Sequence, residues 1–376
     1  MRREGRRSGS AGKLTATVQG ERPKILVIRR DNIGDLVCTT PLIAALRKCH
    51  PRAFIAALVN TYNRDVLAGN PHLDAVYAYG KAKHRSGRES WLATYAQRVR
   101  LVLELRRERF DFAILAGARF LPRALRFARL AGAAHVVGFT EGNNRAEQAI
   151  DMPVPYGDPA GWHEVEDVFR LLAPLGVEGA PPALQLMPDP RLALAMQADV
   201  AARLPGDGPL VGIHISARRL KQRWPVERFA GLMRRLHERH AARFLILWAP
   251  GGERDARHPG DDSKASTLAA MTSGLPVIAV PTIRLAELIA ALSACYFVIC
   301  PDGGAMHLVA ALGKPIVCLF GDSDPSRWRP WGVPYRLLQP ASRDVRDISI
   351  DEVSQAFAAL LAEIRINLPG TAAGPS

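Results

Sequence analysis

Short apolar runs typical of buried strands alternate with amphipathic helical patterns along most of this 376-residue chain. In the first half, the predicted strands lie near residues 24–29, 53–59, 75–79, 111–116 and 135–138, and the predicted helices near 36–49, 90–108 and 122–131. In the second half, the predicted strands lie near 210–215, 243–249, 276–280, 296–300 and 315–319, and the predicted helices near 226–240, 265–273, 284–293 and 304–312. Because strands joined by helices pair in parallel, this pattern predicts α/β sheets covered by helices on both faces.

The chain length predicts two domains, since 376 residues, 48% of them hydrophobic, are enough for two separate cores. A proline-rich stretch with one helical pattern at 191–203 lies between the two alternating regions and is typical of an interdomain connection. We therefore predict a mobile basic tail over 1–22, an N-terminal domain over 23–178, a connection over 179–208 and a C-terminal domain over 209–350. A last helix near 351–366 either continues the second domain or crosses back onto the first.

The formal charge of +14 and the pI near 10.1 suggest an anionic partner. Much of the excess lies before residue 150, in Arg2, Arg3, Arg6, Arg7, Lys81, Lys83, Arg85, Arg88 and the segments 98–109 and 119–129. Either these residues are the solvated faces of surface helices, or they attract an anionic membrane or a phosphorylated or carboxylated acceptor. The sequence shows no basic groove interleaved with aromatic residues, so we expect no nucleic-acid partner.

Composition also limits the location and the cofactors. No apolar stretch reaches the roughly 18 residues of a spanning helix, and the N-terminus lacks the apolar core of a secretory signal, so we expect a cytoplasmic protein. The 5 cysteines form no CxxC pair and lie mostly in apolar runs, which favours buried reduced thiols over disulfides or a zinc site. We expect neither a metal nor a cofactor.

One motif predicts a site for a phosphorylated ligand. The apolar run 295–300 leads into Pro301-Asp302-Gly303-Gly304-Ala305-Met306-His307 and then into a helical pattern. A buried strand that turns through Asp-Gly-Gly into a helix presents free backbone N–H groups and a positive helix end to a phosphate. His307 lies on the first turns of this helix, where a lone histidine either packs or contributes to the phosphate site.

A second strand, turn and helix lie near the N-terminus. The run 24–28 is followed by Arg29-Arg30-Asp31-Asn32-Ile33-Gly34-Asp35 and a helical pattern. Two such sites in separate halves suggest a cleft between two domains. Asp35 is either a charge partner of the helix end or, facing the cleft, a base that accepts a proton from an incoming hydroxyl.

Two further strand ends carry candidate ligand contacts. The loop from His214 to Pro225 places Ser216, Lys221 and Arg223 between a strand and a helix, as a pyrophosphate clamp or as a solvated basic loop. Glu253, which follows another strand, is either a ribose contact or a surface loop residue.

These motifs together resemble glycosyltransferase family 9, the ADP-heptose:lipopolysaccharide heptosyltransferases. The opening of that family is similar to Arg29-x-Asp31-x-Ile33-Gly34-Asp35 with Thr39-Thr40-Pro41 and Ala44-x-Leu46-Arg47. Its C-terminal signature is similar to Asp302-Gly303-Gly304-x-x-His307-x-x-Ala310-Ala311-Leu312-Gly313-x-Pro315, followed by Leu319-Phe320-Gly321 and Trp328-x-Pro330-Trp331-Gly332. The resemblance covers about residues 23 to 365.

The resemblance implies a GT-B fold, with two Rossmann-like domains facing each other across a cleft, the acceptor in the first and the nucleotide-sugar donor in the second. It implies metal-independent, inverting transfer of a sugar, with ADP-heptose as the expected donor substrate and lipopolysaccharide core or a related glycolipid as the acceptor. It assigns Asp35 as general base. The implied donor contacts are Ser216, Lys221 or Arg223, Glu253, Ile283, Asp302, Gly303, Gly304 and His307. The expected place of action is the cytoplasm, at the cytoplasmic face of the inner membrane if the basic surface binds lipid.

Two departures from the family pattern loosen the assignment of heptose as the donor sugar. Gln222 stands where the family has a phosphate-binding lysine, and Gly303 stands where the better-known members have threonine. These changes favour one alternative, a nucleotide-sugar-binding protein without transferase activity. A second alternative is a nucleotide-sugar epimerase, which shares the GT-B architecture.

Overall fold

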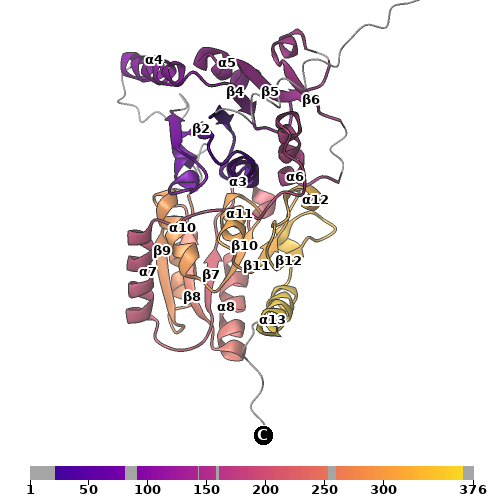
Figure 1. The fold of residues 1–376 in the computed structure, drawn as a ribbon. Helices are drawn as coiled ribbons and strands as arrows, with labels where there is room; N and C mark the ends of the chain where they lie inside the picture. Colours follow the sequence, from indigo (N-terminus) through magenta and orange to yellow (C-terminus); the bar gives the residue numbers. More distant parts are fainter. Residues whose placement is uncertain (1–21, 81–90, 143, 158–160, 253–259, 367–376) are drawn as a thin grey trace, which may run out of the picture. The chain divides into compact units, whose positions relative to one another are not determined.

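The computed structural model describes residues 22–80, 91–142, 144–157, 161–252 and 260–366. Residues 1–21 of the predicted tail, the basic residues Lys81 to Arg88 and the candidate Glu253 lie outside this part of the chain. The chain divides into two compact units, Met1–Gln185 and Leu186–Ser376, and each contains one parallel sheet (Figure 1).

The first unit has a six-stranded sheet in the order β3-β2-β1-β4-β5-β6. Its strands are β1 (Lys24–Ile28), β2 (Phe54–Asn60), β3 (Ala75–Tyr79), β4 (Phe112–Leu115), β5 (His135–Thr140) and β6 (Met152–Pro155). Its helices are α2 (Ile33–Val37), α3 (Thr40–Cys49), η1 (Thr61–Leu67), α4 (Trp91–Glu108), α5 (Pro122–Ala131), η3 (Arg145–Ala149), α6 (Glu164–Phe169) and η4 (Arg170–Leu175). All strand pairs are parallel, so their carboxyl ends lie along one edge.

Both faces of this first sheet are buried. Leu26 and Ile28 of β1 pack into one core with Leu101 and Leu105 of α4 and with α5. Ile25 and Val27, which point to the opposite face by strand alternation, are also buried. Burial on both sides explains why these strands read as continuous apolar runs rather than as alternating ones.

The second unit repeats the same topology, with the order β12-β11-β10-β7-β8-β9. Its strands are β7 (Leu210–His214), β8 (Arg243–Trp248), β9 (Val277–Pro281), β10 (Phe297–Pro301), β11 (Ile316–Leu319) and β12 (Tyr335–Leu338). Its helices are α7 (Pro190–Arg203), η5 (Leu220–Gln222), α8 (Val226–His240), α9 (Asp262–Met271), α10 (Leu285–Ala294), α11 (Gly304–Ala311), α12 (Pro325–Trp328), η6 (Val345–Asp347) and α13 (Ile350–Ile366). The C-terminal helix α13 packs on this second core, with Val353, Phe357 and Leu360 fully buried against α8 and the sheet.

The predicted single helix over 36–49 is wrong, because the structure has two helices here, α2 and α3, separated by Cys38 and Thr39. Pro41 lacks the N–H that a continuous helix would donate to the carbonyl of Val37. The hydroxyl of Thr40 donates to that carbonyl instead, at 2.7 Å. The break places the short helix α2, with Asp35, at the end of β1.

Candidate functional site

The first group of site residues lies at the switch point of the first sheet. β1 is flanked by β2 and β4, and the connections leave from it in opposite directions, so the carboxyl ends of β1 and β4 border the crevice in which doubly wound folds bind ligands. Arg29 follows β1 and Ala116 follows β4, and the Arg29 Nη1 donates to the Ala116 carbonyl at 2.6 Å. This bond joins the two strand ends across the switch point.

Asp35, the predicted base, lies in α2 beside this point with its side chain 15% exposed. Its Oδ1 accepts from Arg29 Nη2 at 2.9 Å, and its Oδ2 accepts from the backbone N and Nδ2 of Asn32 at 2.9 and 3.0 Å. Burial alone raises the pKa of Asp35, but the charge of Arg29 and the bonds from Asn32 outweigh it and lower the pKa below its usual range. Asp35 is therefore an ionised acceptor at neutral pH.

Two residues of this group were not predicted as site residues. In the sequence, Arg29 is only one position of the N-terminal motif and no role was predicted for it. In the structure its side chain is 2% exposed and contacts Asp35 directly. Glu164, the first residue of α6, is fully buried and accepts from Arg29 Nη2 at 2.8 Å. The sequence marks Glu164 only as one of three acidic residues in the first turn of a helix, which ordinarily signals a helix-dipole partner.

The second group lies at the switch point of the second sheet, between β7 and β10. Ser216 follows β7, and its Oγ accepts from the backbone N of Ala249, just after β8, at 2.9 Å. Asp302 follows β10 and is buried, and its Oδ2 accepts from Gln222 Nε2 at 2.7 Å and from the Ser323 hydroxyl. Burial raises the pKa of Asp302, and this effect outweighs the bond from Ser323 and the charge of Arg219, which lower it.

The loop between β7 and α8 carries the other candidate phosphate contacts. Gln222 is buried and turned toward Asp302 and Ser323, so the side chain at the family's lysine position belongs to an internal polar network. Lys221 is exposed, and Arg223 donates through Nε to the carbonyl of Ala217 at 2.9 Å. The loop ends at Trp224, whose ring is buried against Phe229 and whose Nε1 donates to the Ile348 carbonyl.

The turn from β10 into α11 has the geometry that a glycine permits. Gly303, the residue before the helix, has φ 150° and ψ −169°, a backbone conformation that residues other than glycine rarely adopt. Gly304 begins α11, so backbone N–H groups of its first turn are presented at the strand end. His307, one turn later, is 2% exposed and its ring meets Trp328 edge-on at 5.9 Å, so it packs inside the unit.

Two more residues, Ile283 and His214, lie at the carboxyl ends of strands of the second sheet. Ile283 follows β9 and is 79% exposed, an unusual exposure for an isoleucine at a strand end. His214, the last residue of β7, is 7% exposed, and its Nδ1 has no hydrogen-bond partner among the described residues. Burial, with the nearby charge of Lys264, lowers the pKa of His214 to about 4.

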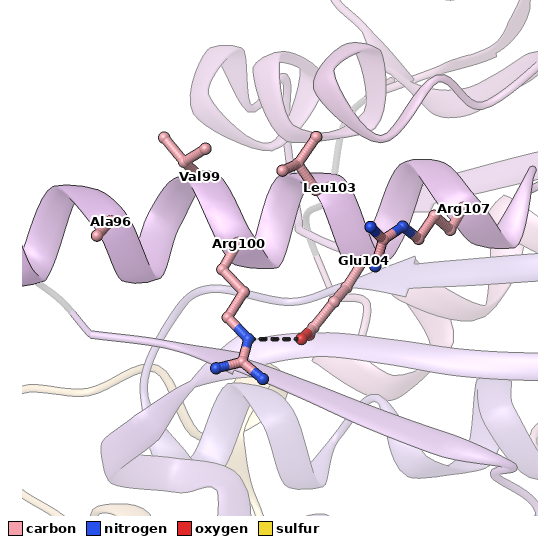
Figure 2. Close-up of a pocket in the computed structure, with 6 residues that line it drawn as sticks. All are labelled: Ala96, Val99, Arg100, Leu103, Glu104 and Arg107. Atoms are coloured by element: carbon pink, nitrogen blue, oxygen red, sulfur yellow. Dashed lines mark hydrogen bonds and ion pairs between the residues drawn. The ribbon is translucent and has the colours of Figure 1, made fainter.

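A strongly basic helical layer, formed by α4 and α5, covers one face of the first sheet. Residues 96–131 contain nine arginines and three acidic residues, a net formal charge of +6, and every one of these arginines is exposed. Val99 and Leu103 are 41% and 50% exposed and project from the same side of α4 (Figure 2). A shallow pocket on this helix is lined by Ala96, Val99, Arg100, Leu103, Glu104 and Arg107.

Within the described ranges, no cluster of three or more His, Cys, Asp or Glu side chains is arranged to hold a metal ion. The same part of the chain contains no helix with the length and apolar character needed to span a bilayer.

Comparison with known proteins gives the same family from sequence. The family model described as "Glycosyltransferase family 9 (heptosyltransferase)" matches residues 98–347. Lipopolysaccharide heptosyltransferase 3 of Escherichia coli is 24% identical over 319 residues, which cover 84% of this chain and 88% of that protein.

Solved structures share the fold at lower sequence identity. A glycosyltransferase family 9 structure from Veillonella parvula superposes with a TM-score of 0.78 at 21% identity, covering 91% of this chain and 98% of that one. The Escherichia coli heptosyltransferase WaaC with ADP-2-deoxy-2-fluoro heptose superposes with a TM-score of 0.70 at 18% identity, covering 89% and 99%. The predicted GT-B type of fold, with two Rossmann-like domains, is confirmed.

Proposed function

The chain belongs to glycosyltransferase family 9, the heptosyltransferase family, and we propose that it transfers a sugar from a nucleotide-sugar, with ADP-heptose the first candidate, to a hydroxyl of lipopolysaccharide core or a related glycolipid. The observation that carries this proposal is Asp35, an ionised carboxylate held at the switch point of the first sheet. Relatives of this chain are lipopolysaccharide heptosyltransferases, and one solved neighbour holds a fluorinated ADP-heptose.

In the proposed reaction, the acceptor oxygen attacks the anomeric carbon while the bond from that carbon to the diphosphate oxygen breaks. Attack from the face opposite the leaving group inverts the anomeric configuration. The nucleoside diphosphate leaves with the bonding electron pair, and the acceptor proton goes to Asp35. General-base catalysis of this kind typically contributes about 10²–10⁴-fold.

The second sheet supplies the donor contacts in this proposal. The N–H groups at the start of α11, the Ser216 hydroxyl and the cations Lys221 and Arg223 bind the diphosphate, and they replace a metal ion in neutralising it. Arg223 is the stronger candidate cation, because a guanidinium held through Nε can still offer two terminal nitrogens to a diphosphate. Ile283 offers an exposed apolar contact for the base, and Glu253 a ribose contact.

The basic layer of α4 and α5 is the proposed contact with the anionic acceptor at the cytoplasmic face of the inner membrane. The seven exposed arginines of these helices complement phosphate and carboxylate groups, and Val99 and Leu103 offer apolar contact to lipid. A lipid-linked acceptor presents both chemistries together.

The test is to incubate the purified protein with ADP-heptose and with other ADP-, UDP- and GDP-sugars, with and without lipopolysaccharide core that lacks heptose. Acceptor-dependent release of the nucleoside diphosphate, with glycosylated core as product, supports the proposal. A modified free donor formed without acceptor would identify an epimerase, and donor binding without turnover would identify a binding protein.

The role of Asp35 is tested by Asp35→Asn. We expect turnover to fall about 10²-fold or more, because an amide cannot accept the acceptor's proton, while donor Kd changes little. Turnover and donor Kd should be measured on the same preparation. Near-normal turnover in this variant would remove Asp35 as the base.

A further inference from the structure

Arg29 forms a buried link between two carboxylates that are distant in sequence. Its Nη2 donates to Asp35 Oδ1 at 2.9 Å and to Glu164 Oε1 at 2.8 Å, and Glu164 is 135 residues further along the chain than Arg29. Its Nη1 donates to the Ala116 carbonyl, and its Nε lies 3.2 Å from Asp31 Oδ2. The guanidinium is therefore fixed from β4, α6 and the turn before α2.

The two carboxylates have different surroundings. The Glu164 side chain is 0% exposed, whereas that of Asp35 is 15% exposed and its Oδ2 lies toward solvent beside Asn32. A fully buried carboxylate requires a paired charge, so Glu164 holds Arg29 in place whether or not a substrate is bound. Arg29 in turn occupies Oδ1 of Asp35, and Oδ2 accepts two bonds from Asn32, one of which an incoming hydroxyl would replace.

We propose that Arg29 and Glu164 are positioning residues for Asp35: Glu164 anchors the guanidinium, and the guanidinium orients the Asp35 carboxylate so that Oδ2 receives the acceptor's proton. This inference rests on the proposed transferase function only for its consequence for catalysis. The dependence of Asp35 on Arg29 is a property of the free protein.

The charges around Asp35 give this link a measurable signature. Arg29, Asp31 and Glu164 belong to one ion-pair network at Asp35. The helix η1, which packs on α2, carries the charged residues Arg64 and Asp65. Burial raises the pKa of Asp35, and the charge of Arg29 is the first influence that opposes it. Without that charge, burial and the remaining carboxylates act together, and the pKa of Asp35 should rise.

The experiment uses variants that retain packing. Removing Arg29 alone would leave Glu164 buried without its counter-charge, so the main variant is the double substitution Arg29→Met/Glu164→Leu, which replaces the pair by apolar groups of similar size. Glu164→Gln keeps Arg29 and removes only the negative charge of its anchor. The control is the double substitution Arg170→Met/Asp167→Asn, which removes both charges of another ion pair in the same part of the unit, with Nη1 and Oδ1 3.0 Å apart, without touching Asp35.

Two readouts separate positioning from stability. The first is the pH titration of the Asp35 carboxyl, followed by ¹³C NMR on aspartate-labelled protein with Asp35→Asn identifying the resonance. The second is kcat and KM for donor as a function of pH. In the double variant we expect the Asp35 titration to move to higher pH, the acidic limb of kcat to move with it, and kcat at neutral pH to fall about 10-fold or more.

We expect Glu164→Gln to give the same changes to a smaller extent, with donor KM unchanged within about twofold, and Arg170→Met/Asp167→Asn to give neither change. A folded double variant with the wild-type Asp35 titration would overturn the inference. So would a moved titration together with an unchanged pH profile of an active enzyme. If the wild-type protein transfers no sugar, the NMR titration still decides whether Arg29 controls Asp35, so failure of the proposed function is recognised separately.

Discussion

Gly321 lies against the loop between β7 and α8 that carries the candidate phosphate contacts. It follows β11, and a Cβ atom added there would lie 2.4 Å from the backbone carbonyl oxygen of Lys221. Because backbone cannot yield as a flexible side chain can, Gly321→Ala should displace η5 and the candidate contacts Lys221 and Arg223. We expect the nucleoside diphosphate Kd to rise about 10-fold, measured by calorimetry, since small misplacements of binding groups are costly.

The matched control for this substitution is Gly274→Ala in the same unit, where an added Cβ meets no atom within 4 Å. This variant should bind the nucleoside diphosphate like the wild type. Equal affinities for both alanine variants would mean that the loop position does not determine diphosphate binding.

His214 makes stability depend on pH. Burial, followed by the charge of Lys264, lowers its pKa to about 4 from 6.5, so the unfolded chain binds the proton more readily than the folded one. The resulting stabilisation is fully present above pH 6.5 and is lost as the pH falls toward 4. The shift corresponds to about 3 kcal/mol between these limits.

We therefore expect the free energy of unfolding of His214→Phe to fall less steeply than that of the wild type between pH 6.5 and pH 4. Urea denaturation at several pH values measures both curves, and their difference isolates the histidine from the other titrating groups. Parallel curves would show that His214 takes up its proton equally well in the folded state.

At the scale of elements, the helical layer of α4 and α5 is the feature to test for membrane binding. Arginines near an anionic surface contribute about 1 kcal/mol each, but exposed charges act only over a Debye length of about 8 Å at physiological ionic strength. Several must therefore be changed together. In the proposed variant, glutamate replaces four arginines: Arg98, Arg107, Arg123 and Arg126.

This four-site variant should bind vesicles containing phosphatidylglycerol at least about 10-fold more weakly than the wild type in co-sedimentation. Wild-type binding should itself weaken with salt and be absent on pure phosphatidylcholine. Donor Kd should not change, because the candidate donor contacts lie in the second unit.

The control reverses four exposed arginines of the second unit, which changes the net charge equally. These are Arg191, Arg203, Arg234 and Arg239. If this control lost vesicle binding to the same extent, net charge rather than the layer of α4 and α5 would be responsible. If neither variant changed, the +14 charge would be that of solvated helix faces.

At the scale of the whole molecule, the two units should respond differently to a nucleoside diphosphate. A ligand at 100 times its Kd stabilises the folded state by about 2.7 kcal/mol. ADP should slow amide hydrogen exchange in residues 214–223 and 301–306 of the second unit, with no change in residues 29–37 of the first. Adenosine, which lacks the diphosphate, should give much weaker protection. Protection confined to residues 29–37 would contradict the assignment of the donor to the second sheet.

The sequence by itself determined the elements whose burial is complete. β1 and β10 were recognised as strands because both of their faces are covered, which gives continuous apolar runs. The Asp-Gly-Gly turn after β10 identified the start of α11, because few residues other than glycine adopt the backbone conformation of Gly303. β6 and β12, two short edge strands, were not predicted. β6 contains two prolines, and its residues are alternately buried and exposed. All residues of β12 are only partly buried. β3 and β9 are edge strands too, but their apolar runs are longer and were recognised, so the shortness of β6 and β12 and their partial exposure explain why these two were missed.

Tertiary structure alone decided which polar side chains meet. Asp302 could be placed from its motif because it directly follows β10, and Asp35 because it lies in the short helix that begins after the turn at the end of β1. Glu164 could not, since its contact with Arg29 depends on where α6 packs, 135 residues further along the chain. Likewise, Gln222 reads in sequence as a missing cation, and only the packing of η5 against the end of β11 turns it inward to Asp302. The order of residues along the chain reveals helices, strands and strand ends. These side-chain pairings instead depend on how elements far apart in sequence pack together, which no local sequence pattern shows.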